Sequence, residues 1–117
     1  MTEYRRGEIV SVDFLHGYRR PAIIVSDSEL ISILDLVSVI PLTEELIDNC
    51  EPLRVRIVKR EGLDTDYDAM IEQLRAVPKE WIKESLTEVN QEEMEKVEEG
   101  IIALLHLKEQ IDSSSSQ

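Results

Sequence analysis

The sequence predicts a mainly β fold of the α+β class, in which a small barrel of short strands is followed by a C-terminal amphipathic helix. Short segments rich in Val, Ile and Leu recur from residue 8 to residue 89, and turn-forming residues separate them. Beyond residue 89 the apolar residues recur at helical spacing instead. The chain has 117 residues, of which 42% are hydrophobic, and this suits one domain with one core.

Three strands are expected before residue 44. Residues 8–14 alternate apolar and polar side chains, which is typical of a half-buried strand. Residues 20–26 are apolar on both faces after their first positions, which predicts a central strand. Residues 31–40 are β-branched and alternating, and they predict a long third strand that ends at Pro41, Leu42 and Thr43.

The second half of the chain predicts shorter elements. Residues 53–58 alternate strictly, with arginines on the outward face of a strand. Residues 69–77 have the composition of a helix, but their place between turn signals and before Pro78 favours a strand. Pro78 predicts one turn of helix over residues 78–83, and residues 86–89 fit a short last strand.

A helix is expected from Asn90 to about Glu109. Asn90 and Glu93 have the spacing of a capping box, with Asn in place of the usual Ser or Thr. Apolar residues from Met94 to Leu105 then form one face, and the opposite face is acidic. We expect one folded domain over residues 1–111 and a disordered polar tail over residues 112–117.

Charge is distributed unevenly along the chain. The formal net charge is −12, yet all eight arginines lie between residues 5 and 75. A strongly acidic protein is usually a poor non-specific binder of nucleic acid. A local arginine cluster can still hold a short single strand, weakly and with a steep salt dependence.

The remaining composition excludes several classes of protein. The single cysteine, Cys50, cannot form an internal disulfide and has no paired cysteines or histidines beside it, so we expect no metal site. The N-terminus lacks the apolar region of a signal peptide, and every apolar run is too short to cross a membrane. We therefore expect a cytoplasmic protein without a metal or a cofactor.

Arg20 stands where a turn meets the second strand. Gly17 can adopt a positive φ in the turn, and Pro21 biases Arg20 towards an extended backbone. A guanidinium held on a rigid strand can present its planar fork to a phosphate. The alternative is a surface ion pair between Arg20 and Asp13 or Asp66.

An ordered set of short motifs resembles the MazF/PemK toxin family. The motifs are, in chain order, Arg6-Gly7-Glu8-Ile9, Gly17-x-x-Arg20-Pro21-Ala22-Ile23-Ile24-Val25, Val39-Ile40-Pro41-Leu42-Thr43, Gly62-Leu63-x-x-Asp66, Gln73-Leu74-Arg75-x-Val77 and Met94-x-x-Val97. No single motif is specific, but the order and the spacing are those of the family over nearly the whole chain.

The resemblance implies a small SH3-like β-barrel of the MazF/PemK/CcdB type with a C-terminal helix, which works as a homodimer. It implies the toxin of a type II toxin–antitoxin system, acting as a sequence-selective, metal-independent endoribonuclease. Such an enzyme cleaves single-stranded RNA, in particular mRNA, through attack by the 2′-OH. It also implies a cognate antitoxin protein that covers the RNA groove.

Two residues match the family's catalytic pair. Arg20 matches the catalytic arginine, whose charge neutralises the pentavalent phosphorane, and Thr43 matches the catalytic threonine, whose hydroxyl can hydrogen-bond a phosphate oxygen. A role for Arg20 in proton transfer is harder to support, because arginine is almost always protonated. The alternative for Thr43 is a turn cap over Glu44 and Glu45.

Further residues are assigned to RNA binding by the same resemblance: Arg19, Tyr67, Glu72, Gln73 and Arg75. Arg19 is either a second phosphate contact or a solvated neighbour of Arg20. Tyr67 stands where the family commonly has a serine, and it either adds a surface for base stacking or blocks the groove. For Glu72, Gln73 and Arg75 there are two alternatives: they match positions near the RNA groove of the family, or they form the outward face of a strand. His16 could be a general base near the site, but a lone histidine in a turn is more often simply exposed.

Other functions compete with the nuclease. The acidic charge, the short connection at residues 15–19 and Tyr67 leave open a catalytically weak or inactive member that acts by binding protein. A CcdB-like gyrase inhibitor is disfavoured, because that type needs a tryptophan near its C-terminus and the only tryptophan here is Trp81. A peptide-binding SH3-like module needs an aromatic groove, and aromatics make up only 4% of the chain. The presence of both Arg20 and Thr43 favours the nuclease.

Overall fold

Seven strands and two α-helices form the part of the chain that the structure describes. The computed structural model describes residues 4–15 and 17–115. The strands are β1 (Glu8–Leu15), β2 (Tyr18–Ile24), β3 (Leu36–Thr43), β4 (Arg54–Ile57), β5 (Tyr67–Met70), β6 (Arg75–Pro78) and β7 (Ile82–Glu88). The helices are α1 (Ser28–Ile33) and α2 (Gln91–Ser115), and the single 3₁₀ turns are η1 (Ile71–Gln73) and η2 (Lys79–Trp81).

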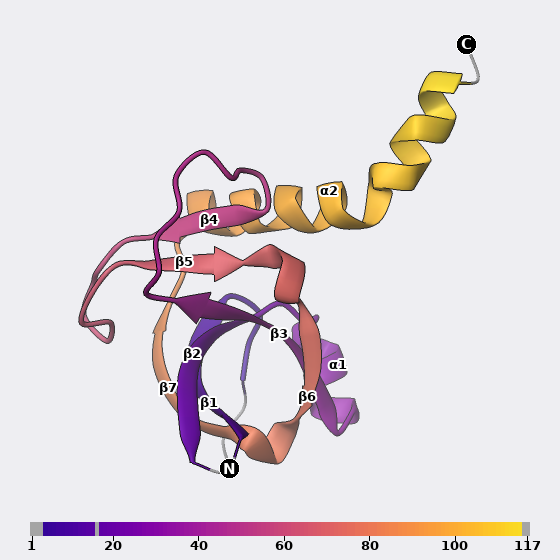
Figure 1. The fold of residues 1–117 in the computed structure, drawn as a ribbon. Coiled ribbons are helices and arrows are strands. Elements are labelled where there is room, and N and C mark those ends of the chain that lie inside the picture. The colour runs from indigo at the N-terminus through magenta and orange to yellow at the C-terminus, as the bar shows by residue number, and fades with distance from the viewer. Residues whose placement is uncertain (1–3, 16, 116–117) are drawn as a thin grey trace.

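The strands form one antiparallel sheet in the order β4-β5-β3-β2-β1-β7, with β6 also paired to β3. Figure 1 shows β1, β2, β3, β6 and β7 curving around a common interior, while α2 runs behind β4. Within the described residues β7 pairs only with β1 and β6 only with β3, so the hydrogen-bonded ring is not closed. The α+β class is confirmed, and the expected barrel is a strongly curved open sheet.

The curved sheet separates two apolar clusters. The inner cluster fills the curve with residues from five strands and from α1: Val10, Val12, Phe14, Ala22, Ile24, Ile31, Val37, Val39, Val77 and Ile82. The outer cluster lies between the other face of the sheet, β4, β5 and α2, and it contains Ile9, Ile23, Ile40, Leu42, Val55, Ile57 and Val97 among others. Because successive side chains of a strand point to opposite faces, β2 contributes to both clusters, as expected for a central strand.

The strand predicted over residues 31–40 is wrong in its first half. Residues 31–33 belong to α1, which begins after Asp27, and residues 34–35 connect it to β3. The Asp27 carboxylate accepts a hydrogen bond from the Glu29 N–H at 2.7 Å, and the Asp27 carbonyl accepts one from the Ile31 N–H at 3.1 Å. This capping satisfies the first turn of the helix. The helix buries Ile31 and leaves Ile33 72% exposed, and β3 begins only at Leu36.

The strand predicted over residues 69–77 is two strands with a 3₁₀ turn between them. β5 pairs Ala69 with Leu42, whereas β6 pairs Arg75 with Val39. Between these two pairs β3 spans three residues, from Leu42 to Val39, whereas the segment from Ala69 to Arg75 spans six. This segment therefore contains three residues more than continuous pairing with β3 would need. Those three residues form η1 (Ile71–Gln73), which lets both strands bond to the same edge of β3.

The remaining predictions hold with shifted ends. β2 begins at Tyr18 and ends at Ile24, so Arg20 lies within it, and the predicted strand at residues 86–89 is the end of the longer β7. The helical turn predicted over residues 78–83 is η2.

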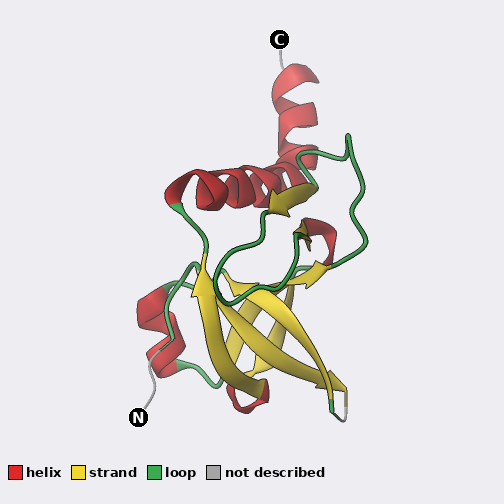
Figure 2. Cartoon of the chain, turned by 90° about the vertical axis from the view of Figure 1, so that its left-hand side faces the viewer, coloured by secondary structure: helices red, strands yellow, loops and turns green. Residues whose placement is uncertain are grey.

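The helix cap is confirmed. The Asn90 side chain accepts from the Glu93 N–H at 2.7 Å, and the Glu93 carboxylate accepts from the Asn90 N–H at 2.9 Å. α2 continues past the predicted end near Glu109 to Ser115, and the boundary at residue 111 stays a prediction. Figure 2 shows α2 above the sheet and α1 at its side. Within residues 4–15 and 17–115, no helix is long and apolar enough to cross a membrane.

Candidate active site

Arg20 and Thr43 come from neighbouring strands at the same end of the sheet. β2 and β3 are antiparallel, and the last pair of their ladder at this end joins Ala22 to Pro41. Arg20 and Thr43 each lie two residues beyond that pair, at the same end of the two strands. Both residues line one pocket. The fold therefore brings together the two residues that the sequence assigned to catalysis.

Arg20 is held without an ion pair. Its Nη2 donates a hydrogen bond to the Tyr18 hydroxyl at 2.6 Å, and its Cζ lies 5.3 Å from the centroid of the Tyr18 ring. The Asp13 carboxylate accepts instead from the Gly17 N–H, at 2.9 Å, and the Asp66 carboxylate accepts from a backbone N–H of the β4–β5 connection. Among the described residues Arg20 has no carboxylate within 4.0 Å, so its charge is not neutralised by the protein.

Thr43 is the last residue of β3, and its backbone pairs with Asp68. Its Oγ1 accepts a hydrogen bond from the Glu45 N–H at 3.1 Å, which is the turn cap considered from the sequence. Capping does not use up the hydroxyl, because an O–H that accepts one hydrogen bond still has its own proton to donate. The cap fixes Oγ1 in place while that proton stays available.

A pocket of about 580 Å³ joins these groups, and it is lined by Tyr18, Arg19, Arg20, Pro21, Leu42, Thr43, Glu44, Glu45 and Tyr67. It gathers four of the residues predicted for catalysis or RNA binding: Arg19, Arg20, Thr43 and Tyr67. Two arginines and two glutamates thus line one cavity. Such a lining can bind a phosphate and also accept hydrogen bonds from a base or a hydroxyl.

Tyr67 forms a wall of this pocket. Its side chain belongs to the outer apolar cluster and is only 6% exposed, which leaves little of the ring face for stacking. Its hydroxyl donates to the Asp64 carboxylate at 3.4 Å. Burial raises the pKa of the Tyr67 phenol, and the Asp64 and Glu44 carboxylates raise it further. A neighbouring pocket of about 420 Å³ shares Pro21 and Tyr67 with the first.

Three residues predicted to bind RNA lie elsewhere. Glu72 and Gln73 are exposed in η1, and Glu72 forms an ion pair with Arg54 at 3.2 Å. Arg75 begins β6, and its guanidinium lies 5.3 Å from the centroid of the Phe14 ring. None of the three lines the pocket of Arg20 and Thr43.

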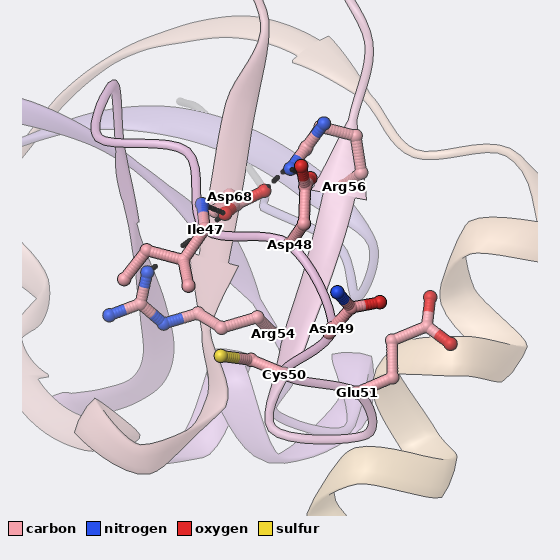
Figure 3. A pocket seen from close by; sticks show the side chains of 8 residues that line it. All are labelled: Ile47, Asp48, Asn49, Cys50, Glu51, Arg54, Arg56 and Asp68. Atoms are coloured by element: carbon pink, nitrogen blue, oxygen red, sulfur yellow. Dashed lines mark hydrogen bonds and ion pairs between the residues drawn. The ribbon is translucent and has the colours of Figure 1, made fainter.

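A second pocket, of about 710 Å³, lies under the loop between β3 and β4 (Figure 3). Its centre is the carboxylate of Asp68, which is 1% exposed. One Asp68 oxygen accepts from Arg56 Nε at 2.6 Å, and the other accepts from the Ile47 N–H at 2.8 Å. Arg56 also pairs with Asp48 at 3.0 Å, and the two carboxylates raise the pKa of Arg56.

Arg54 completes this network. Its Nη1 is buried 4.0 Å from an Asp68 oxygen and has no hydrogen-bond partner among the described residues, while its Nη2 pairs with Glu72. Both arginines of the second pocket thus face carboxylates of the protein, unlike Arg20. We interpret the network as the anchor of the loop that follows Thr43.

Sequence reasoning missed three residues of the first pocket: Tyr18, Glu44 and Glu45. Tyr18 lies next to the two arginines in the sequence, and this proximity was the available signal. The two glutamates were considered only as the residues capped by Thr43. His16 lies outside the described residues, and Cys50 is exposed. Among the described residues no group of three His, Cys, Asp or Glu side chains could hold a metal ion.

Comparison with known proteins gives one family. The model of the PemK-like, MazF-like toxin of type II toxin–antitoxin systems matches residues 5–105. An endoribonuclease solved in complex with its cognate antitoxin from Mycobacterial species has a TM-score of 0.70 and 22% identity, over 90% of this chain and 95% of that one. The MazE-MazF structure (Form-II) from Deinococcus radiodurans has a TM-score of 0.74 and 20% identity, over 90% and 97%. The Mycobacterium tuberculosis toxin MazF-mt6 has a TM-score of 0.72 and 16% identity, over 81% and 92%.

Proposed function

Because the chain belongs to the family of PemK-like, MazF-like toxins of type II toxin–antitoxin systems, we propose that it is a metal-independent endoribonuclease that cleaves single-stranded RNA at selected sequences. The observation that carries this proposal is the shared pocket of Arg20 and Thr43, in which Arg20 has no carboxylate partner among the residues that the structure describes. A cation in that state is free to receive a phosphate. We further propose a reducing, cytoplasmic setting for this activity.

The proposed reaction forms a bond between the 2′-oxygen of a ribose and the adjacent phosphorus while the bond from phosphorus to the 5′-oxygen breaks. The products are a 2′,3′-cyclic phosphate and a free 5′-hydroxyl. Negative charge grows on the phosphoryl oxygens in the transition state, and donors already aimed at those oxygens stabilise it. The Arg20 guanidinium and the Thr43 hydroxyl are these donors.

Two protons move in this reaction. The 2′-OH must lose a proton, and the 5′-oxygen must gain one. Glu44 and Glu45 line the pocket, and a carboxylate can accept a proton. We assign the removal of the 2′-OH proton to one of these two glutamates, because a guanidinium has no acceptor site for a proton. The 5′-oxygen can take its proton from the protonated glutamate or from water.

The proposed partners follow from the family. The similar mycobacterial endoribonuclease was solved with its cognate antitoxin, and the Deinococcus protein in a MazE-MazF complex. We propose that this chain also has an antitoxin protein as partner and acts as a homodimer. Its net charge of −12 repels a polyanion, so we expect RNA to bind through the local cations Arg19 and Arg20.

The test is an assay of purified protein with a long unstructured RNA, at low salt and with EDTA. Wild type is compared with Arg20→Ala and Thr43→Ala. Arg6→Ala is the matched control, because the Arg6 guanidinium forms an exposed ion pair with Glu98 at 2.7 Å. We expect discrete fragments with cyclic phosphate ends from wild type and from the control. Both pocket variants should lose at least about 100-fold in rate, as for the removal of a transition-state donor.

Intact RNA after incubation with wild type at several salt concentrations would contradict the proposed nuclease. The alternative is then a catalytically weak or inactive family member that acts by binding protein. A second contradiction would be equal cleavage by wild type and Arg20→Ala, because this points to a contaminating nuclease.

A further inference from the structure

Tyr18 and Arg20 form one unit on the surface of β2. Their positions differ by two, so both side chains project from the same face of the strand. The Arg20 Nη2 donates to the Tyr18 hydroxyl at 2.6 Å, and the Arg20 Cζ lies 5.3 Å from the Tyr18 ring centroid. Tyr18 thus contacts the guanidinium with its hydroxyl and with its ring. Both residues line the candidate active site.

Arg20 has a neutral partner, whereas Arg56 and Arg60 have carboxylate partners. Arg56 donates to the Asp68 carboxylate, and Arg60 donates to the Glu93 carboxylate. A carboxylate orients a guanidinium but also cancels its charge. A phenol is neutral, so Tyr18 restrains the guanidinium and leaves its full positive charge for another anion.

The contact adds little to the folded core. Tyr18 is 54% exposed, and it belongs to neither apolar cluster. A hydrogen bond between exposed groups contributes little to stability, because water replaces either partner. The most useful consequence of the contact is therefore the orientation of Arg20.

We propose that Tyr18 is a positioning residue that orients the Arg20 guanidinium for the transition state of RNA cleavage. This inference rests on the proposed function and deepens it. Arg20 has five N–H donors, and Tyr18 occupies one of them. The other donors stay available for the phosphoryl oxygens. With its guanidinium already restrained in the free enzyme, Arg20 loses less conformational entropy when the charge develops.

The kinetic test compares Tyr18→Phe, which keeps the ring, with Tyr18→Leu, which removes ring and hydroxyl. Rates are measured on a short RNA that spans a mapped cleavage site. We expect kcat to fall about fivefold in Tyr18→Phe and about tenfold to thirtyfold in Tyr18→Leu. KM should stay within about twofold, because the lost orientation matters mainly in the transition state.

The matched control is Tyr4→Phe, because Tyr4 is a partly buried tyrosine that lines a different pocket. This variant should keep the kcat of wild type. Melting temperatures of wild type and the Tyr18 variants should agree, because an exposed side chain is removed. A fall in kcat of Tyr18→Phe no larger than that of Tyr4→Phe would overturn the proposal.

A second measurement needs no RNA. The side-chain Nε–H of Arg20, assigned by its loss in Arg20→Lys, reports the order of the guanidinium through ¹⁵N relaxation. We expect this order to be higher in wild type than in Tyr18→Phe, and lowest in Tyr18→Leu. Equal order in all three proteins would overturn the positioning role.

The two proposals fail differently. If wild type leaves RNA intact, the nuclease proposal fails, and the relaxation measurement still decides whether Tyr18 orders Arg20. If wild type cleaves RNA and Arg20→Ala does not, while Tyr18→Phe retains the wild-type kcat, only the role of Tyr18 is refuted.

Discussion

The guanidinium of Arg60 holds the carboxylate of Glu93 through two hydrogen bonds. Nη1 donates to Oε1 at 2.8 Å, and Nη2 donates to Oε2. Glu93 Oε1 also accepts from the Asn90 N–H at 2.9 Å, so the cap of α2 and the ion pair share one carboxylate. Glu93 is only 8% exposed. The pair therefore ties the turn after β4 to the beginning of α2.

This carboxylate predicts an acid-sensitive contribution to stability. Burial acts to raise the pKa of Glu93, but hydrogen bonds from Arg60 and from the Asn90 N–H outweigh it and lower the net pKa. The stabilisation should be fully present above the ordinary glutamate pKa of about 4.3 and disappear as pH falls through the lower folded pKa. We expect wild type to melt at a higher temperature than Glu93→Gln at pH 7, and this difference to shrink towards pH 3.

The control for this prediction is Glu92→Gln, because Glu92 is the exposed neighbour of Glu93. It should leave the pH dependence of the melting temperature unchanged. A difference between wild type and Glu93→Gln that stays constant from pH 7 to pH 3 would contradict the proposed origin.

Asp68→Asn should loosen the loop that follows Thr43. The variant removes the charge that faces Arg54 and Arg56 in an almost fully buried position. We expect the free energy of unfolding to fall by about 2 kcal/mol, because hydrogen bonds to charged groups are lost there. Urea denaturation measures this change. Asp48→Asn is the control: its carboxylate is 82% exposed and should contribute almost nothing.

Thr43→Ser and Thr43→Val separate the hydroxyl from the shape of the side chain. Serine keeps the hydroxyl, which caps Glu45 and can still donate. Valine has the shape of threonine without it. We expect cleavage by Thr43→Ser within about tenfold of wild type and a loss of at least about 100-fold in Thr43→Val. Similar activity of the two variants would mean that the hydroxyl acts only as a cap.

Replacing either glutamate of the candidate active site should change RNA affinity and kcat in opposite directions if that glutamate is the general base. In Glu44→Gln and Glu45→Gln a negative charge beside the phosphate site is removed, so RNA affinity should rise, by about twofold to fivefold at low salt. The variant that lacks the general base should nevertheless lose about 100-fold in kcat. If both variants keep the wild-type kcat, neither glutamate is the base.

Gly100→Ala should destabilise the protein although alanine favours helices. Gly100 is buried in α2, and a Cβ placed there would lie 2.5 Å from the Pro52 carbonyl oxygen. Helix propensity alone predicts a gain of about 1 kcal/mol. We expect a net loss of about 1 to 3 kcal/mol instead, because backbone must move to relieve the contact. The exposed neighbour provides the control, and Glu99→Ala should change stability by less than about 0.5 kcal/mol.

The sequence predicted much of the fold because local patterns determine it. Alternation of apolar residues marked β1 and β4, a continuous apolar run marked β2, and the Asn90–Glu93 spacing marked the cap of α2. The errors lie where tertiary pairing outweighs composition. Residues 31–33 have strand-like composition, yet Asp27 caps them as a helix. The break at η1 comes from the register with β3, which no local pattern contains.

The sequence by itself determined which groups are available at the candidate site: an arginine before Pro21 at the beginning of one strand and a threonine at the end of another. Only the tertiary structure decided which of these groups meet and what their charges face. It placed Arg20 and Thr43 in the lining of one pocket and gave Arg20 a neutral phenol as partner, while it turned Arg54 and Arg56 towards Asp68. The physical reason is that electrostatic interaction depends on distance and burial, and the register of distant strands sets both.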